Sequence, residues 1–557
     1  RGLIYDRNGI LLADNRPTYN LTVVTERTND IDRLIATIGS LIDISEDETK
    51  SFKKRLRRRI PYEKTTLKFN LTEHERGVLA VNGYLLAGVE VSARLTRFYP
   101  EGELYAHIIG YVGRINEQEI QRIDRAKYSG TDSIGKIGLE SFYEAQLLGS
   151  VGTEQVETNA RGRVMRILDN VDPVPGDNLT IHIDSRLQRV AYKAFKGERG
   201  ALVAIDVNTG GILAMVSAPS YDPNLFVSGI SQAEYSALLD SPGRPLFDRS
   251  IRGQYPPGST IKPLFGLIGL ASNSISIDYT IDDPGYFIME DIERPWRDHN
   301  SKSGGHGKGV GLARAIIESC DVFFYKMSIK IGIDLLSNYS KKFGLGQVTG
   351  IDIHGEQPGI MPSRIWKKSA RGESWFNGDT INVSIGQGFM LTTPLQLGVM
   401  MARIASKGKM VKPQLVKSIN GNPVIGIENT ESIGIAAEHW AYIHQAMKAV
   451  VHSPRGTARR INRDINYTIA GKTGTAQVIS IKAEEEYDSS KIDKSQWDHA
   501  LFVAFAPVEN PQIAIGLIVE NGEHGSSAAA PIARLVMDAY MKSKAGSHQS
   551  TESEVLH

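Results

Sequence analysis

The sequence predicts a multidomain α+β protein that contains an antiparallel sheet with helices packed on it. Its 557 residues exceed one ordinary hydrophobic core, so we expect two or three domains. Two pairs of apolar strands, within residues 201–219 and 499–521, bracket a helix-rich middle. A connector rich in proline and glycine, residues 172–177, indicates the main boundary, which gives modules of residues 1–172 and 173–541.

The elements follow from local patterns along the chain. The first 26 residues read as strand, turn and strand, because Asn8-Gly9 tolerates the positive φ of a tight hairpin. Residues 130–166 predict an amphipathic helix between two glycine-rich turns, followed by a strand. The polar residues 542–557 lack periodicity and predict a disordered tail.

Composition excludes several classes of protein. Hydrophobic residues make up 41% and charged residues 23%, which argues against disorder, collagen-like repeats and a polytopic membrane protein. A net charge of +1 gives no electrostatic case for nucleic acid as the main partner. The single cysteine, Cys320, excludes an intrachain disulfide, and cysteine scarcity fits an oxidising compartment. Because the chain begins at Arg1 rather than Met, we expect any membrane anchor to lie in a missing preceding segment.

The most informative segment for chemistry is Ser259-Thr-Ile-Lys262. A turn of prolines and Gly258 precedes it and an apolar run follows, so Ser259 lies at a helix N-terminus, where the helix dipole favours developing negative charge. Lys262, three residues on, lies on the same helical face within reach of the Ser259 hydroxyl. A neutral lysine in that position can act as the base that activates a serine nucleophile.

Downstream context separates this pair from three other Ser-x-x-Lys sequences in the chain, which read as exposed helix pairs. Lys472-Thr473-Gly474-Thr475 lies between strand-like residues and suits one wall of a cleft. There Lys472 and Thr473 can bind a substrate carboxylate, and Gly474 lets a substrate backbone approach closely. Ser319-Cys320-Asp321 lies between these two segments, and Ser319 can relay a proton while Asp321 accepts a hydrogen bond.

With these three motifs in this order, the chain resembles the class B penicillin-binding proteins, and within them the penicillin-binding protein 2 group. The resemblance extends over nearly the whole chain, and includes residues 135–144, 157–163 and 375–388. The departure is Asp321, where the wider superfamily commonly has asparagine, and this leaves open whether Asp321 supplies an amide-like contact or a charge.

The resemblance implies an elongated, non-catalytic N-terminal pedestal that binds partners, followed by a penicillin-recognising transpeptidase domain with helices on both sides of its sheet. It implies peptidoglycan D,D-transpeptidation in cell-wall elongation and rod-shape maintenance, through an acyl-enzyme on Ser259. The backbone N–H groups of Ser259 and Thr475 would hold the oxyanion. Lys262 would be the base, Ser319 would pass the proton to the departing D-alanine, and β-lactams would acylate Ser259.

The same resemblance implies partners and a location. The partners are peptidoglycan stem peptides, a RodA-type glycan polymerase and an MreC-type scaffold. The location is the bacterial inner membrane, with a single-pass anchor and a periplasmic catalytic domain.

One group of residues suggests a metal. From the residues alone, Cys320 together with one imidazole and two carboxylates could complete a tetrahedral site, and a buried cysteine among solvated carboxylates is the alternative. Some members of the penicillin-binding protein 2 group carry a structural zinc, which implies Zn²⁺ here as a structural and not a chemical cofactor. The preferred ligands are Asp283, Asp298, His306 and Cys320, with Asp282 and His299 as substitutes.

Two other functions remain open. A D,D-carboxypeptidase or β-lactamase-type hydrolase of the same superfamily would pass the acyl group to water, but the sequence lacks a Glu-x-x-Leu-Asn type motif to supply the deacylating base. A β-lactam sensor or scaffold would keep the fold without turnover. A serine triad that uses His499 is disfavoured, because adjacent strand residues such as Asp498 and His499 point to opposite faces.

Overall fold

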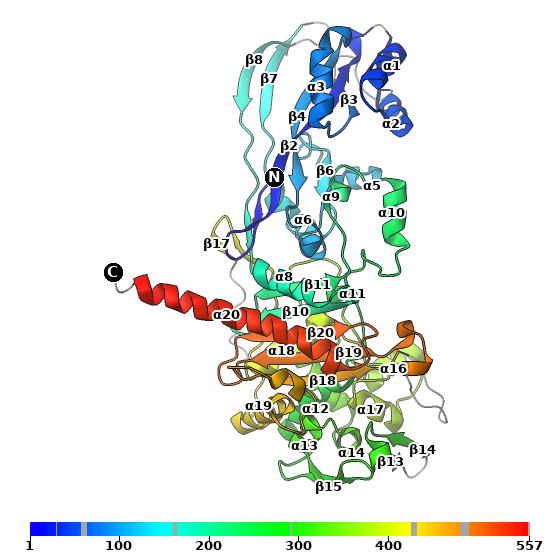
Figure 1. Ribbon diagram of the computed structural model, residues 1–557, viewed down its shortest axis with the longest axis vertical. Helices are drawn as coiled ribbons and strands as arrows, with labels where there is room; N and C mark the ends of the chain where they lie inside the picture. The colour runs from blue at the N-terminus through cyan, green and yellow to red at the C-terminus, as the bar shows by residue number, and fades with distance from the viewer. Residues whose placement is uncertain are drawn as a thin grey trace.

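The protein is an elongated molecule in which an N-terminal module stands on a C-terminal module (Figure 1). The structure is a computed structural model that describes residues 1–28, 30–56, 64–159, 164–289, 292–424, 432–478 and 489–554. In the part of the chain it describes, no helix combines the length and apolar character needed to cross a membrane.

The N-terminal module is built on a long hairpin-like ladder between two strands. Strand β2 (Leu11–Val24) pairs antiparallel with β4 (Val89–Phe98), and its far end also pairs with β3. The other elements are β1 (Ile4–Tyr5), η1 (Thr25–Arg27), α1 (Ile31–Leu41), α2 (Glu46–Leu56), β3 (Lys64–Lys68), α3 (Glu73–Val81), η2 (Gly83–Leu85), η3 (Gly102–Tyr105), α4 (Ala106–Ile109), β5 (Val112–Arg114), α5 (Glu117–Ile120), β6 (Ser133–Gly135), α6 (Gly138–Phe142), α7 (Glu144–Leu148), β7 (Thr153–Thr158) and β8 (Val164–Val171).

The predicted N-terminal strand, turn and strand are present. Gly9 has a φ of +85°, and the Asp6 carboxylate accepts hydrogen bonds from the backbone N–H groups of Asn8 and Ile10, both at 2.8 Å. The single helix predicted within residues 130–166 is instead two short helices, α6 and α7. They separate at Tyr143, whose φ and ψ of −103° and 28° leave the helical region.

The C-terminal module contains a five-stranded antiparallel sheet in the order β11-β10-β20-β19-β18. Its strands are β10 (Gly200–Asp206), β11 (Ile212–Ala218), β18 (Ala470–Ala476), β19 (His499–Ala506) and β20 (Ile513–Val519). Both predicted apolar strand pairs are therefore hairpins of this sheet, and they pair with each other through β10 and β20. Strand β18, which carries the Lys-Thr-Gly motif, is an outer strand.

The remaining elements of this module are β9 (Leu179–Ile181), α8 (Ser185–Ala194), α9 (Asn224–Val227), α10 (Gln232–Leu239), α11 (Arg249–Arg252), η4 (Gly258–Ile261), α12 (Lys262–Ala271), β12 (Thr280–Asp283), β13 (Tyr286–Met289), β14 (Ile292–Arg297), η5 (Ser301–Ser303), β15 (Gly307–Gly311), α13 (Leu312–Ile317), α14 (Asp321–Ile331), α15 (Ile333–Lys342), α16 (Arg364–Arg371), α17 (Asn377–Ser384), α18 (Pro394–Ala405), β16 (Val416–Ile419), β17 (Asn422–Pro423), α19 (Ala437–His452), η6 (Arg459–Asn462), η7 (Ser489–Lys491), η8 (Lys494–Gln496), η9 (Gly525–Ala529) and α20 (Ala530–Glu554).

Helices cover the five-stranded sheet. Helix α18 packs against β10, β19 and β20, while α8 packs against β11 and α20 (Figure 1). Gly516 of β20 permits the close approach of α18, because a Cβ there would lie 2.4 Å from the backbone nitrogen of Gly398. The predicted α+β class with an antiparallel sheet is confirmed.

A second sheet joins the two modules. Strand β1 pairs in parallel with β9, and β9 pairs in turn with β16, so hydrogen bonds cross the boundary predicted at residues 172–173. The connector therefore leads from the separate hairpin of β7 and β8 into a sheet that both modules share.

Residues 542–554 of the segment predicted as a disordered tail, 542–557, belong to a helix, and residues 555–557 lie outside the described part of the chain. Helix α20 continues as far as Glu554. Its first half is anchored by buried residues such as Val536 and Met537, and no proline follows to stop the helix.

Candidate active site and metal centre

Ser259 lies in η4, at the junction between a tight turn and α12. The turn needs glycine at 258: its φ is +53°, and a Cβ there would lie 2.4 Å from the carbonyl oxygen of Thr475 on β18. The backbone N–H of Gly258 donates to the carbonyl of Gly386 at 3.0 Å. These contacts fix half-buried Ser259 beside the outer edge of β18.

Lys262 begins α12 and is fully buried. Its ammonium donates to the backbone carbonyl of Ser319 at 2.7 Å and to the Asp321 carboxylate at 2.5 Å, and it lies 3.3 Å from the Ser319 hydroxyl. Among the described residues, the Ser259 hydroxyl has no hydrogen-bond partner. The resting structure therefore pairs Lys262 with Asp321 instead of with the serine one helical turn away.

The segment Ser319-Cys320-Asp321 lies between α13 and α14. Ser319 has a φ of +64°, which is unusual for a residue with a side chain. Asp321 starts α14, where its negative charge complements the helix dipole. Burial alone would raise the pKa of Asp321, but the Lys262 charge and a hydrogen bond from His299 hold that pKa well below its ordinary value. Asp321 is therefore a charged partner of Lys262 in this structure.

Lys472 completes the cluster from β18. Its ammonium donates to the Ser319 hydroxyl at 2.8 Å and to the carbonyl of Thr473 at 3.0 Å. Burial lowers the pKa of Lys472 well below its ordinary value, and the charge of Lys262 lowers it further. The Ser319 hydroxyl thus lies between two amines, which suits a group that relays protons.

Two neighbours of the Lys-Thr-Gly strand were not predicted. The Thr457 hydroxyl lies 2.8 Å from the Thr473 hydroxyl, and the Gln387 side-chain amide donates to the carbonyl of Thr475 at 3.2 Å. The sequence gives no signal for either contact, because both depend on how separate segments of the chain lie along β18.

The rejected histidine triad also has a structural explanation. The His499 ring nitrogen Nδ1 accepts a hydrogen bond from the backbone N–H of Asn521 at 3.0 Å, and the ring packs edge-on against Tyr255. Asp498 accepts from the backbone N–H of Val478 at 3.2 Å. Both side chains are engaged in structural contacts.

The preferred metal ligands gather at one buried point. The ligand atoms of Asp283, Asp298, His306 and Cys320 all lie within 4.8 Å of one another. His306 Nδ1 lies 2.7 Å from the Asp283 carboxylate and 3.7 Å from that of Asp298, and Cys320 Sγ lies 3.2 Å from Asp283. Four buried donors of nitrogen, oxygen and sulfur are the type and number that a tetrahedral zinc site uses.

The two substitute ligands point elsewhere. Asp282 is exposed and accepts a hydrogen bond from the backbone N–H of Gly309 at 3.0 Å. His299 lies outside the four-residue group, with its Nδ1 3.1 Å from Asp298 and 3.8 Å from Asp321. It forms instead a second group of potential ligands with those two aspartates, one of them partly exposed.

The buried group is connected directly to the catalytic segment. Asp298 accepts a hydrogen bond from the backbone N–H of Asp321 at 2.6 Å, and Cys320 accepts one from the backbone N–H of Phe323 at 3.4 Å. Burial raises the pKa of the Cys320 thiol, and the carboxylates of Asp298 and Asp283 raise it further. A cation among these residues would offset that effect and favour the thiolate.

Comparison with known proteins agrees with this geometry. Residues 200–538 match the family model described as the penicillin binding protein transpeptidase domain, and residues 1–181 match the penicillin-binding protein dimerisation domain. The chain belongs to the penicillin-binding proteins. The predicted family is confirmed, and so is a transpeptidase as the class of enzyme.

Several penicillin-binding proteins resemble the chain over almost its full length. It is 42% identical to peptidoglycan D,D-transpeptidase MrdA of Acinetobacter baumannii, over 97% of this chain and 80% of the relative. It is 40% identical to MrdA of Escherichia coli strain K12, over 97% of this chain and 86% of the relative.

Solved penicillin-binding protein 2 structures share the fold. The Pseudomonas aeruginosa protein in complex with WCK 5153 has a TM-score of 0.75 and 39% identity, and covers 97% of this chain and 95% of its own. The Helicobacter pylori protein in complex with MreC has a TM-score of 0.81 and 29% identity, and covers 97% of both chains.

Proposed function

We propose that this transpeptidase cross-links peptidoglycan stem peptides through an acyl-enzyme on Ser259, during cell-wall elongation. The observation that carries the proposal is the convergence of three segments. Ser259 lies beside the outer edge of β18, and the Ser319 hydroxyl lies between the amines of Lys262 and Lys472. The MrdA relatives, named as peptidoglycan D,D-transpeptidases, support the substrate class.

Acylation begins with transfer of the Ser259 proton to a neutral Lys262. The serine oxygen then attacks the carbonyl carbon of the penultimate D-alanine, and the backbone N–H groups of Ser259 and Thr475 hold the oxyanion. When the tetrahedral intermediate collapses, the peptide bond breaks and terminal D-alanine leaves with a proton that passes through Ser319. The donor peptide is now attached to the Ser259 oxygen as an ester.

Transfer completes the cycle. The amine of a second stem peptide attacks the ester carbonyl, a new amide bond forms, and the Ser259 oxygen recovers its proton. The outer edge of β18 offers unpaired backbone groups along which an extended peptide can lie. Lys472 and Thr473 lie at that edge, where they can bind the carboxylate of the donor.

Asp321 sets the resting state of the base. Lys262 must leave its contact with the Asp321 carboxylate before its amine can accept the Ser259 proton. Catalytic hydrogen bonds are often loose in free enzymes and tighten when substrate binds, so this resting contact is compatible with the proposed role.

The test is mass spectrometry of the intact protein after treatment with a penicillin. We expect one adduct per chain, mapped to the peptide that contains Ser259, and none in the Ser259→Ala variant. Ser51→Ala is the matched control, because Ser51 belongs to another Ser-x-x-Lys pair on exposed helix α2 and should label normally. An adduct that survives in Ser259→Ala contradicts the proposal, and an adduct lost within minutes favours a hydrolase.

We also propose that Asp283, Asp298, His306 and Cys320 hold a structural zinc ion. The ion would fix the segment that carries Ser319 and Asp321, since Asp298 already binds the backbone N–H of Asp321. Acyl transfer by serine and lysine needs no Lewis acid, so the chain's own residues carry every step. We expect about one zinc per chain by elemental analysis of protein purified without added metal, and a lower melting temperature after chelation. Folded protein that contains no zinc would contradict this proposal.

We further propose that the N-terminal module binds an MreC-type scaffold and a RodA-type glycan polymerase, at the inner membrane with the catalytic domain in the periplasm. One structural relative is a complex of penicillin-binding protein 2 with MreC, and another is described as a peptidoglycan synthase complex that coordinates polymerization and crosslinking. Co-purification of each partner with the intact protein, compared with residues 173–541 alone, tests the assignment to the module. Equal binding by both would contradict it.

A further inference from the structure

The segment between α19 and β18 carries a concentration of positive charge. Within nine residues it contains four arginines, and all four side chains are exposed: Arg455, Arg459, Arg460 and Arg463. Three of them, Arg459, Arg460 and Arg463, line a hollow of about 430 Å³, and a second hollow of about 530 Å³ adjoins it. We call the four arginines together with these hollows the arginine groove. His452 and Asn462 line both hollows, so the two form a continuous depression.

Most of this charge is not neutralised within the protein. Arg455 lies 3.4 Å from Glu318, and Arg459 donates to the carbonyl of Pro454 at 2.8 Å. Among the described residues, Arg460 and Arg463 have no ion-pair partner. Asp464 is the only carboxylate among the described residues that line the hollows, and its backbone carbonyl accepts a hydrogen bond from Arg534.

The backbone beneath these arginines is held in place. Arg534 of α20 donates to the backbone carbonyls of Ile461, Arg463 and Asp464, the last two at 3.1 and 3.2 Å. At the other end of the depression, the His452 ring accepts a hydrogen bond from the backbone N–H of Ile469 at 3.0 Å. The arginines therefore project from a backbone fixed on both sides.

One residue of the segment that carries these arginines contacts the Lys-Thr-Gly strand. The Thr457 hydroxyl lies 2.8 Å from that of Thr473 in the Lys-Thr-Gly strand. Arg455 and Arg459 are each two residues from Thr457, so their Cα atoms lie within about 8 Å of its Cα. The arginines therefore belong to the same segment as a residue that contacts the Lys-Thr-Gly strand.

We propose that the arginine groove binds free carboxylates of the peptidoglycan strand, outside the residues that react at Ser259. Arginine is suited to this role because its planar guanidinium binds a carboxylate through two parallel hydrogen bonds. The stem peptides of peptidoglycan carry several carboxylates, and they are long enough to extend beyond the cleft. This inference rests on the proposed transpeptidase function and adds to it a site that selects anionic strands.

The experiment measures equilibrium binding of uncross-linked peptidoglycan strands to the Ser259→Ala protein, which cannot turn them over. Strands with free carboxylates are compared with strands whose carboxylates have been amidated. The groove variant is Arg460→Glu/Arg463→Glu, with Arg460→Gln/Arg463→Gln as a milder form. The matched control is Arg122→Glu/Arg125→Glu, because both of those arginines are exposed on the N-terminal module.

We expect the groove variant to bind free-carboxylate strands at least about tenfold more weakly than the control. The loss of one hydrogen bond between charged groups lowers the affinity by about that factor. Amidation should weaken binding to the protein with an intact groove by more than it weakens binding to the groove variant, because both proteins also lose the carboxylate contact with Lys472 and Thr473. Added salt should reduce the effect of amidation. Unchanged binding in the groove variant would overturn the proposal, and so would equal affinity for amidated strands.

Penicillin labelling of protein that retains Ser259 separates this result from the proposed function. Failure to label Ser259 refutes the acyl-enzyme, while the strand-binding comparison still decides the role of the groove.

Discussion

The Ser319 hydroxyl is held in place at some cost in backbone strain. Its φ of +64° lies in a region that is unfavourable for residues with a Cβ, and such strain persists only where the surroundings over-determine it. Here Lys262 holds the carbonyl of Ser319 and Lys472 holds its hydroxyl. The neighbouring buried group of Asp298 and Cys320 fixes the following turn. The proton relay is therefore positioned by contacts that exist before substrate binds.

The turn before Ser259 gives a prediction about a single methyl group. In Gly258→Ala, the new Cβ would clash with the Thr475 carbonyl, so Ser259 must move relative to β18. We expect the rate of acylation by a penicillin to fall about a hundredfold, because small displacements of a nucleophile are that costly. Gly9→Ala is the control, since Gly9 also has a positive φ, of +85°, but has open space around it.

The acylation rate of each variant is measured by stopping the reaction with a penicillin at a series of times and counting the labelled protein. Equal rates for the two alanine variants would mean that the approach of Gly258 to β18 does not position the nucleophile.

Local sequence patterns predicted the long strands of the sheet better than they predicted the contacts between distant parts of the chain. The apolar strands β10, β11, β19 and β20 are each long enough to show a clear pattern between turn residues. Strands β9 and β16, which join the modules, have only three and four residues, and their partners are distant in the chain. Such short strands carry no periodic signal, so the shared sheet could not be predicted.

At the site, too, the sequence predicted residues better than it predicted their contacts. The motifs identified Ser259, Lys262 and Lys472, because each belongs to a short pattern with a chemical reason. The contact of Thr457 with Thr473 depends on how a separate segment lies along an outer strand, and no local pattern specifies that. Likewise, spacing left His299 and His306 as rival ligands, and only the folded loop shows that His306 faces Cys320 and the two aspartates.

The end of β20 supplies a support for the loop that precedes Ser259. Glu520 accepts a hydrogen bond from the Tyr255 hydroxyl at 2.6 Å and forms an ion pair with buried Arg249 at 2.9 Å. Burial opposes ionisation of Glu520, but the Arg249 charge holds its pKa below the ordinary value of 4.5. A carboxylate with a lowered pKa stabilises the fold above its unfolded pKa, and this contribution is lost as the pH falls through the folded pKa.

Glu520→Gln should therefore reduce the free energy of unfolding by about 2–4 kcal/mol at neutral pH, because it leaves buried Arg249 without a counterion. The difference from wild type should shrink at pH values below about 4.5, where the wild-type carboxylate also becomes protonated. Denaturant unfolding at several pH values measures this. Glu198→Gln is the control, since the Glu198–Lys494 pair is exposed and should contribute less than about 1 kcal/mol. A difference that does not depend on pH would contradict the role of the charge.

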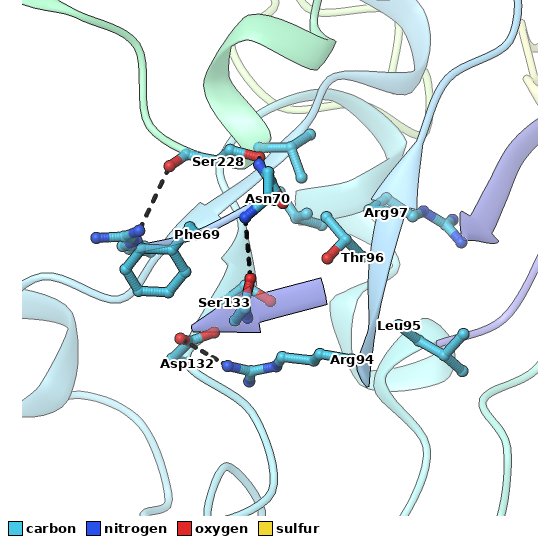
Figure 2. Close-up of a pocket in the computed structure, with 13 residues that line it drawn as sticks. Phe69, Asn70, Arg94, Leu95, Thr96, Arg97, Asp132, Ser133 and Ser228 are labelled. Atoms are coloured by element: carbon cyan, nitrogen blue, oxygen red, sulfur yellow. Dashed lines mark hydrogen bonds and ion pairs between the residues drawn. The ribbon is translucent and has the colours of Figure 1, made fainter. Parts of the chain in front are cut away.

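The two modules meet at a second place besides the shared sheet. Helix α9 of the C-terminal module packs against β4 and β5, beside a hollow of about 60 Å³ (Figure 2). At its rim, the side chains of Asn70 and Arg114 both donate to Ser228, Asn70 to the hydroxyl and Arg114 to the backbone carbonyl at 3.4 Å. Phe226 of α9 stacks on Tyr111 with ring centroids 4.4 Å apart. The position of the N-terminal module is therefore coupled to the segment that follows β11.

Asn224 makes two hydrogen bonds across this contact between the modules. Its side-chain oxygen accepts from the backbone N–H of Tyr99 at 2.9 Å, and its amide donates to the Tyr99 carbonyl at 3.0 Å. Tyr99 is buried, so Asn224→Ala leaves its backbone N–H without a partner, at about 1–3 kcal/mol. The Tyr99 carbonyl keeps the hydrogen bond from the backbone N–H of Gly102 at 3.2 Å. We expect faster hydrogen exchange in peptides that contain Tyr99 and residues 112–114, and a wider distribution of module orientations by small-angle scattering. Leu225→Ala, on the same helix with a side chain that is 37% exposed, should change neither measurement. Because β1, β9 and β16 still join the modules, Ser259 should remain reactive toward a penicillin, and unchanged exchange at Tyr99 would show that α9 does not couple them.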